Sequence, residues 1–221
     1  MCRVKYDITG HHTTFSINGV CIILSYHCEY ISSKTYNKLI SLVKNSDKSL
    51  ISIGANQAYW KVKWDSDFET MECRKDLTFF KDTYSFGGMW KHNFKNESKF
   101  LGVRYSDAGY NTYAPYKITN CNHWLLDNIQ IPSDSLFGKN GIDSLGLSGL
   151  ETDKVTIYSK NNVEIIAKGI NLKDGGAHMV FKQYNNDNAI LSTGSIQSGS
   201  GLGTDVIFTK IVQNFVEKYH E

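Results

Sequence analysis

The stretch of sequence that decides the fold is residues 19–60, GVCIILSYHCEYISSKTYNKLISLVKNSDKSLISIGANQAYW. It begins with the apolar run 20–24, which is too short to span a membrane and is rich in β-branched residues. Such a run predicts a strand that is buried on both faces, as in a parallel sheet. A second apolar run, 50–53, predicts another strand, and it ends at Gly54.

A helical pattern separates these two runs. Either Ser32 or Ser33 can cap its N-terminus. Four residues recur at positions i, i+3, i+4 and i+7, namely Tyr36, Leu39, Ile40 and Val43. Strand, helix and strand form a βαβ unit with a right-handed crossover. Ligands of open α/β sheets bind beyond the carboxyl ends of the strands, so we expect the chemistry at this edge.

Composition places the chain among soluble globular proteins. It has 221 residues, 41% of them hydrophobic and 21% charged, with a net charge of +2. This charge gives no electrostatic case for binding to nucleic acid or to an anionic membrane. No stretch has the length of a membrane span, and the N-terminus lacks the layout of a signal peptide. The scattered cysteines lack a CxxC motif and predict thiols in a reducing, cytoplasmic compartment.

We interpret the whole chain, 1–221, as a single α/β domain. Its α/β core comprises about 1–60 and 155–221, and a mostly antiparallel, β-rich insertion comprises about 61–154. A doubly wound sheet needs more than two parallel strands. We therefore expect an N-terminally truncated sheet, with earlier strands preceding Met1.

Strand and turn signals fill the rest of the chain. A hairpin is predicted from 58–64 and 70–74, with its turn at 65–67. In the last third we expect strands at 155–158 and 163–167, a hairpin of 178–181 with 189–195, and a flexible loop at 199–203. A closing helix follows, capped by Thr204 or Asp205, and its apolar face comprises Ile207, Ile211, Val212, Phe215 and Tyr219.

Three of the polar residues near the predicted strand ends have side chains suited to chemistry. His27 and Glu29 are two residues apart, so on an extended chain they leave the same side. They can hold a metal or form a general-base pair, or they are simply a hydrogen-bonded pair. Asn56 can orient a substrate carbonyl or stabilise an oxyanion, or it is a turn residue in the left-handed conformation.

Glu151 follows a glycine-rich loop and can enter the same edge as an acid or base, although it is also an ordinary loop carboxylate by its context. Cys28, Ser195 and Ser198 lack the glycine-flanked elbow that exposes a nucleophile. The adjacent pair at 11–12, two histidines, is interpreted as part of a loop.

Several short blocks, in this order, resemble one known family. They are YDIT at 6–9, ILSYHCEY at 23–30, GANQAYW at 54–60, GGMW at 87–90, GLETD at 149–153 and STGSI at 192–196. The family is the N,N-dimethylformamidase large (beta) subunit-like, C-terminal domain family. Within it, the HxEY and GxNxxYW blocks at this separation are the most specific part.

The resemblance implies a glutamine-amidotransferase-like (flavodoxin-like) layered sheet without a cysteine nucleophile. It also implies an amide hydrolase with a mononuclear iron, held by two tyrosinates and a glutamate, that acts on a small amide substrate. By position, Glu29 is the metal ligand, His27 an acid or base, Asn56 the group that orients substrate or oxyanion, and Glu151 a second carboxylate that assists water attack.

This chain departs from the family pattern at several points. Neither tyrosine ligand has a counterpart here, so Tyr26 or Tyr30 would have to substitute. Ala55 replaces the second of two glycines, and Ile31 replaces a tryptophan. We therefore expect a second subunit or an N-terminal portion to complete the site. The alternative is a non-catalytic binding or assembly domain derived from the same fold.

Overall fold

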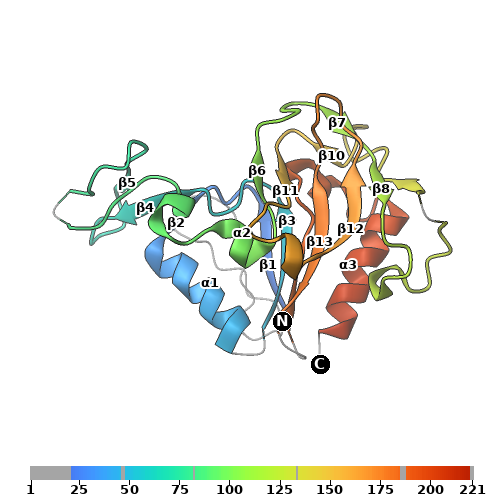
Figure 1. Cartoon of the computed structure of the whole chain (residues 1–221), viewed down its shortest axis with the longest axis horizontal. Coiled ribbons are helices and arrows are strands. Elements are labelled where there is room, and N and C mark those ends of the chain that lie inside the picture. Colours follow the sequence, from blue (N-terminus) through green and yellow to red (C-terminus); the bar gives the residue numbers. More distant parts are fainter. Residues whose placement is uncertain (1–20, 46–47, 82, 133, 185–187, 220–221) are drawn as a thin grey trace.

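A large mixed sheet organises the computed structural model, which describes residues 21–45, 48–81, 83–132, 134–184 and 188–219 (Figure 1). Its seven strands run in the order β1-β3-β14-β13-β12-β8-β9. Their bounds are β1 Cys21–Tyr26, β3 Ser49–Gly54, β14 Ala189–Ser192, β13 His178–Gln183, β12 Glu164–Gly169, β8 Tyr116–Ile118 and β9 Leu136–Phe137. β1, β3 and β14 are parallel neighbours, and the remaining pairings in this sheet are antiparallel.

The expected α/β class is confirmed, as a mixed sheet with few helices. The prediction on residues 11–12 lies outside the described residues.

The predicted βαβ unit is confirmed. β1 pairs in parallel with β3, and α1 (Ser33–Asn45) connects them. The Ser32 hydroxyl caps this helix, because it accepts the Thr35 N–H at 3.2 Å. Tyr36, Leu39 and Val43 are buried, as their spacing predicts.

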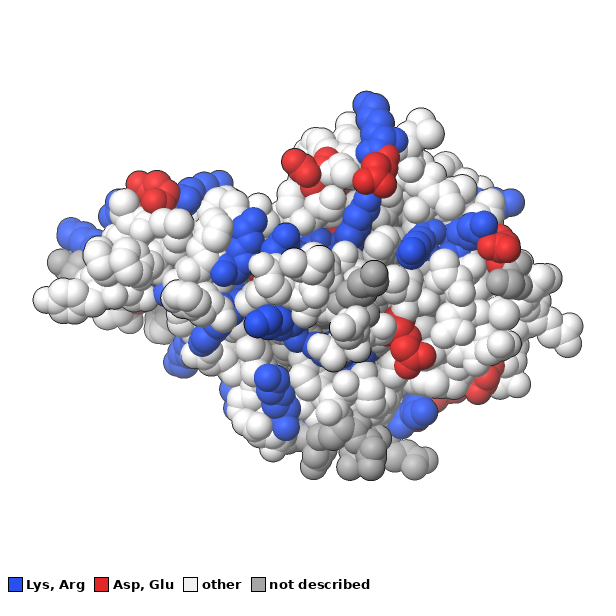
Figure 2. Space-filling model, viewed as in Figure 1, with Lys and Arg blue, Asp and Glu red and all other residues white. Residues whose placement is uncertain are grey.

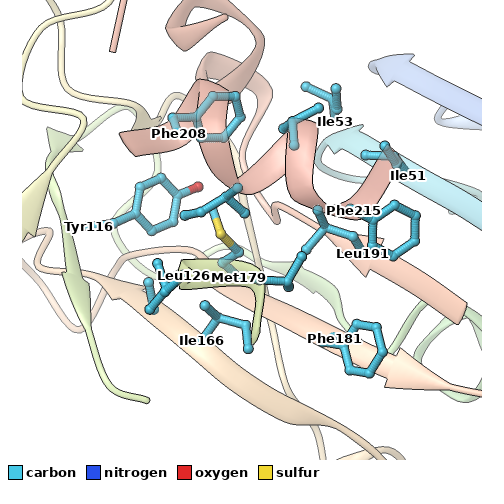
Figure 3. Packing of buried hydrophobic residues seen from close by; sticks show 14 of the residues in the cluster. Ile51, Ile53, Tyr116, Leu126, Ile166, Met179, Phe181, Leu191, Phe208 and Phe215 are labelled. Carbon is cyan, nitrogen blue, oxygen red and sulfur yellow. The ribbon is translucent and has the colours of Figure 1, made fainter. Parts of the chain in front are cut away.

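Two hydrophobic clusters lie on opposite faces of the sheet. The smaller cluster joins α1 to β1, and Leu50 of β3 belongs to it. The larger cluster lies under α3 (Val206–Lys218), where Phe208 and Phe215 pack among sheet residues such as Ile51 and Leu191 (Figure 3). Adjacent residues of β3 therefore serve different clusters, and β3 is buried on both faces.

The prediction that the first strand is buried on both faces is wrong. In β1, Ile22 and Leu24 are buried, whereas Ile23 is 37% exposed. β1 lies at the end of the sheet in the described part of the chain, and α3 packs over more central strands. The apolar run alone does not show how far the covering helix extends.

Smaller sheets and short helices surround this core. β2 (Tyr30–Ser32), β4 (Trp60–Trp64) and β5 (Met71–Cys73) form a three-stranded sheet. Two ribbons pair β6 (Arg104–Ser106) with β11 (Thr152–Lys154), and β7 (Tyr113–Ala114) with β10 (Ser148–Gly149). The short helices are η1 Trp90–Asn93, α2 Glu97–Leu101, η2 Trp124–Leu126, η3 Lys160–Asn162 and η4 Ile196–Gly201.

Three predicted local structures are confirmed. β4 and β5 form the first hairpin, and the Asp65 carboxylate in its turn accepts the N–H groups of Glu69 and Thr70. β13 and β14 form the second. Asp205 caps the closing helix by accepting the Phe208 N–H at 2.8 Å.

Two other local predictions are wrong. Residues 155–158 form no strand, because Val155 N–H donates to the His178 imidazole and a turn follows, in which Ser159 N–H donates to Thr156 O. Residues 199–201 of the predicted flexible loop belong to η4, in which Ser198 and Gly201 are buried. A Cβ on Gly201 would lie 2.3 Å from Leu147, so this segment is packed tightly.

The predicted insertion, 61–154, supplies β8 and β9 to the large sheet, and the division into core and insertion stays a prediction. On the face in Figure 2, Lys and Arg gather around α1 and α2, and acidic residues lie farther out. Across the described ranges, no helix is long and apolar enough to cross a membrane. A cytoplasmic location and the absence of nucleic-acid partners stay predictions.

Candidate functional site

Two segments of the chain meet at the carboxyl ends of β1 and β3. Tyr26 and Gly54 are register partners at the ends of these parallel strands. Beyond them, Ala58 N–H donates to Cys28 O at 2.8 Å, and Tyr59 N–H donates to Glu29 O at 2.9 Å. The YHCEY and GANQAYW blocks therefore lie side by side at the predicted sheet edge.

Gln57 holds the turn that carries His27. Its side-chain Oε1 accepts Cys28 N–H at 2.8 Å, and its Nε2 donates to Tyr26 O at 3.0 Å. These two bonds fix the backbone on either side of His27. Gly54 permits this arrangement, because a Cβ there would lie 1.9 Å from the Tyr26 carbonyl oxygen.

The structure brings together all four candidate residues. His27 Nε2 lies 3.7 Å from Glu29 Oε2 and 3.4 Å from Glu151 Oε2. The Asn56 side-chain Nδ2 donates to Glu151 Oε2 at 2.9 Å. The side chains of His27, Glu29 and Glu151 are 24%, 19% and 17% exposed, so the cluster is largely shielded from solvent but not closed off.

Two buried polar atoms of this cluster have no hydrogen-bond partner among the described residues. They are His27 Nε2 and Asn56 Oδ1. Buried polar atoms are normally paired, so each unpaired one calls for an explanation. A water molecule or a polar substrate group between these side chains would satisfy both.

The chain segment that carries Glu151 is anchored from several sides. Ile196 N–H donates to Glu151 O, Asp153 N–H donates to Gly194 O, and β11 pairs with β6. The Asp153 side-chain Oδ1 accepts the Asn56 backbone N–H at 2.7 Å. Burial raises the pKa of Asp153 to about 7, and the Asn56 hydrogen bond opposes this rise.

Two tyrosines lie near the cluster. The Tyr59 and Tyr105 rings meet edge to face, with centroids 5.7 Å apart. Burial raises the pKa of both phenols, that of Tyr105 to about 12, and the charges of Glu29 near Tyr59 and Glu151 near Tyr105 add to the rise. Both side chains are therefore neutral phenols at pH 7, able to donate a hydrogen bond.

A further buried acid, Glu97, interacts electrostatically with this region. Its side chain is almost fully buried, and Glu97 Oε1 lies 3.8 Å from the Arg104 guanidinium. Burial raises the pKa of Glu97 to about 7, and the Arg104 charge opposes the rise. Its charge raises the pKa of both Tyr59 and Asp153.

The residues with a nucleophilic side chain have other roles. Cys28 is buried in the smaller hydrophobic cluster. The Ser195 hydroxyl accepts Gly149 N–H, and the Ser198 hydroxyl donates to Ser195 O. Tyr26, one candidate substitute for a tyrosinate ligand, is 63% exposed.

His27, Glu29 and Glu151 have side chains of the kind that bind iron. However, no group of three or more His, Cys, Asp or Glu residues in the described ranges is arranged to hold a metal ion. Tyrosine is not among these residue types, so this absence leaves the predicted centre of two tyrosinates and one glutamate untested. Iron, with Glu29 as its ligand, stays a prediction.

Sequence reasoning missed Gln57 and Asp153. Gln57 adjoins Asn56, and Asp153 is two residues after Glu151, the same spacing that singled out His27 and Glu29. That spacing was the available signal for Asp153. The contacts of Gln57 with Tyr26 and Cys28 have no local sequence signature.

A family described as N,N-dimethylformamidase beta subunit-like, C-terminal, matches residues 4–213. The chain belongs to this family. The match contains His27, Glu29, Asn56 and Glu151, so the dimethylformamidase-like domain includes the entire candidate site. The reference to a beta subunit is in keeping with a second subunit. No curated protein matches the chain.

Proposed function

We propose that this chain is an amide hydrolase-type domain of glutamine-amidotransferase-like fold that cleaves the C–N bond of a small linear amide. Family membership supports the reaction class. The observation that carries the proposal is the convergence of His27, Asn56 and Glu151, with the two contacts to Glu151 Oε2 at 3.4 and 2.9 Å. Three parallel strands at the site edge support the fold assignment.

In the proposed reaction, Glu151 removes a proton from a water molecule whose oxygen attacks the amide carbonyl carbon. His27 lies close enough to receive this proton from Glu151 and pass it to the departing nitrogen. The C–N bond then breaks, and the products are a carboxylic acid and an amine. Glu151 accepts one N–H of the Asn56 amide, and the other N–H is free to stabilise the oxyanion.

Glu29 is the candidate ligand if iron takes part. Iron would act as a Lewis acid toward the amide carbonyl. The remaining ligands would be tyrosines of this chain, such as Tyr26 or Tyr30, or groups of a second subunit. The steps assigned to His27, Asn56 and Glu151 do not depend on it.

The test is release of formate from formamide, N-methylformamide and N,N-dimethylformamide by the purified chain. We expect hydrolysis of at least one of them, and loss of a general base in Glu151→Gln lowers kcat by on the order of 10²-fold or more. Glu217→Gln is the matched control, because Glu217 lies on the exposed side of α3, with a side chain 69% exposed. Equal activity of Glu151→Gln and the wild type would contradict the assignment, and no hydrolysis of any amide would contradict catalysis by this chain.

Metal content is measured on the same preparation. Stoichiometric iron with a tyrosinate-to-iron absorption band, both lost in Glu29→Gln, is the outcome expected if iron takes part. A folded, metal-free chain would assign the missing ligands to a partner or remove iron from the proposal.

A further inference from the structure

We propose that Asp153 is a positioning residue that holds Asn56 so that its side-chain amide faces Glu151. This inference rests on the proposed function. Asp153 Oδ1 accepts the Asn56 backbone N–H at 2.7 Å, and Asn56 Nδ2 donates to Glu151 Oε2 at 2.9 Å. Glu151 and Asp153 belong to one short segment, so the contacts close a ring between that segment and Asn56.

Asn56 needs such a restraint. Its backbone is in the left-handed region, with φ of 53°, and Ala58 follows with φ of 54°. Non-glycine residues adopt this conformation at an energetic cost, and they keep it where surrounding contacts impose it. The Asp153 carboxyl supplies such a contact, because it accepts the Asn56 backbone N–H.

The direction of the Asn56 amide matters for the chemistry. An ionised carboxylate only accepts hydrogen bonds, so Asn56 must present its nitrogen to Glu151. Its Oδ1 is then left buried without a partner in the described structure. A rotated Asn56 would lose the Glu151 contact and move the amide away from the reacting atoms.

The Asp153 side chain is not needed to hold its own strand. The Asp153 backbone N–H donates to Gly194 O, and β11 pairs with β6 through backbone bonds. The residue is only 2% exposed. Burial of a carboxyl group is costly, and the Asn56 N–H is the partner that this carboxyl contacts. We therefore infer that the Asp153 side chain serves the candidate site and is not needed for the pairing of β11.

The first experiment uses NMR and needs no substrate. In the wild type, a coupling across the hydrogen bond between Asn56 N and the Asp153 carboxyl carbon is expected. Its absence would overturn the proposal without any variant. In Asp153→Ala, the Asn56 side-chain amide exchanges with solvent at least about tenfold faster, as expected for loss of one hydrogen bond. Asp153→Asn retains an acceptor and restores slow exchange.

The Asn214 side-chain amide is the internal control, because it donates to Leu125 O and Asp127 O, on a different part of the fold. Equal acceleration at Asn214 and Asn56 would show general loosening and overturn a positioning role. Unchanged exchange at Asn56 would overturn it as well.

Kinetics then connect the position to the reaction. With the best of the three formamides, Asp153→Ala lowers kcat by on the order of 10- to 100-fold with KM little changed, and Asp153→Asn recovers most of the rate. A change in KM alone, with kcat unchanged, would contradict the assignment. If the wild type hydrolyses no amide, the proposed function fails, whereas the NMR result still decides whether Asp153 positions Asn56.

Discussion

The turn that carries His27 depends on Gln57, and Gln57→Met tests this dependence. Methionine has nearly the volume of glutamine, so the substitution removes both hydrogen bonds with little change in packing. Cys28 N–H then loses the Gln57 acceptor, and Tyr26 O loses the Gln57 donor. The first loss is the larger, because the Tyr26 carbonyl belongs to a residue that is 63% exposed and can be hydrated.

The magnitude follows from these two environments. Loss of the hydrogen bond to the buried Cys28 N–H costs about 1–3 kcal/mol, and loss of the bond to the Tyr26 carbonyl, which can be rehydrated, costs about 0.5–1.5 kcal/mol. Together they predict that Gln57→Met lowers the free energy of unfolding by about 1.5–4.5 kcal/mol. Gln57→Glu keeps an acceptor for Cys28 N–H but places a carboxylate oxygen against Tyr26 O, and both oxygens only accept hydrogen bonds. This variant therefore also lowers the stability of the folded state.

Urea denaturation at equilibrium measures this change. Gln197→Met is the control, because the Gln197 side chain bonds to the exposed Asp143, and we expect a change within about 0.5 kcal/mol. A Gln57→Met protein as stable as the control would refute the account of the His27 turn. So would a destabilised Gln57→Met protein in which His27 keeps its backbone amide shifts.

Three further predictions concern Gly54, Asp153 and Asp205. Gly54→Ala lowers the free energy of unfolding by at least about 1–3 kcal/mol, because the new Cβ would meet the Tyr26 carbonyl oxygen at 1.9 Å. Thermal denaturation compares it with Gly199→Ala, which meets only an ordinary contact at 3.7 Å, and equal melting temperatures would contradict the close approach. Burial raises the pKa of Asp153 from 3.8 to about 7, so the folded state binds more protons than the unfolded state in this window. The free energy of unfolding of the wild type, relative to that of Asp153→Asn, therefore falls as pH rises from about 4 to about 7. Urea denaturation at each pH measures this difference, and a difference that rises across that window would contradict the raised pKa. Asp205→Ala lowers the free energy of unfolding by roughly 1–2 kcal/mol, since it removes the cap of α3 and the acceptor of Gly138 N–H. Urea denaturation measures this change, and an unchanged stability would contradict the capping role.

Local patterns predicted the elements in which the spacing of apolar residues matches the buried face. Helical spacing located α1 and α3, and alternation with a turn located the β4–β5 hairpin. The strand predicted at 155–158 failed because pairing with β6 ends at Lys154, and the following residues turn away from the sheet. Hydrophobic pattern does not encode where a distant partner strand stops.

In the candidate site too, some residues follow from local pattern and others depend on distant parts of the chain. His27, Glu29 and Asn56 were predictable because parallel strands place their carboxyl ends at one edge. Glu151 reaches this edge from a segment 95 positions beyond Asn56 in the chain, which spacing cannot reveal. Gln57 and Asp153 act through backbone contacts with residues far away in sequence. The spacing of Asp153 from Glu151 was a signal for Asp153, whereas only the folded arrangement identifies Gln57.

The most direct test of the account is a double-mutant cycle on His27 and Glu151, read as kcat/KM for formate release from the best of the three formamides. The two side chains lie 3.4 Å apart, and we propose that they pass one proton between them. Residues that act as one unit show non-additive losses. We therefore predict that the protein with both His27→Gln and Glu151→Gln is no slower than the slower single variant. Losses that multiply in the double variant would contradict a shared catalytic role.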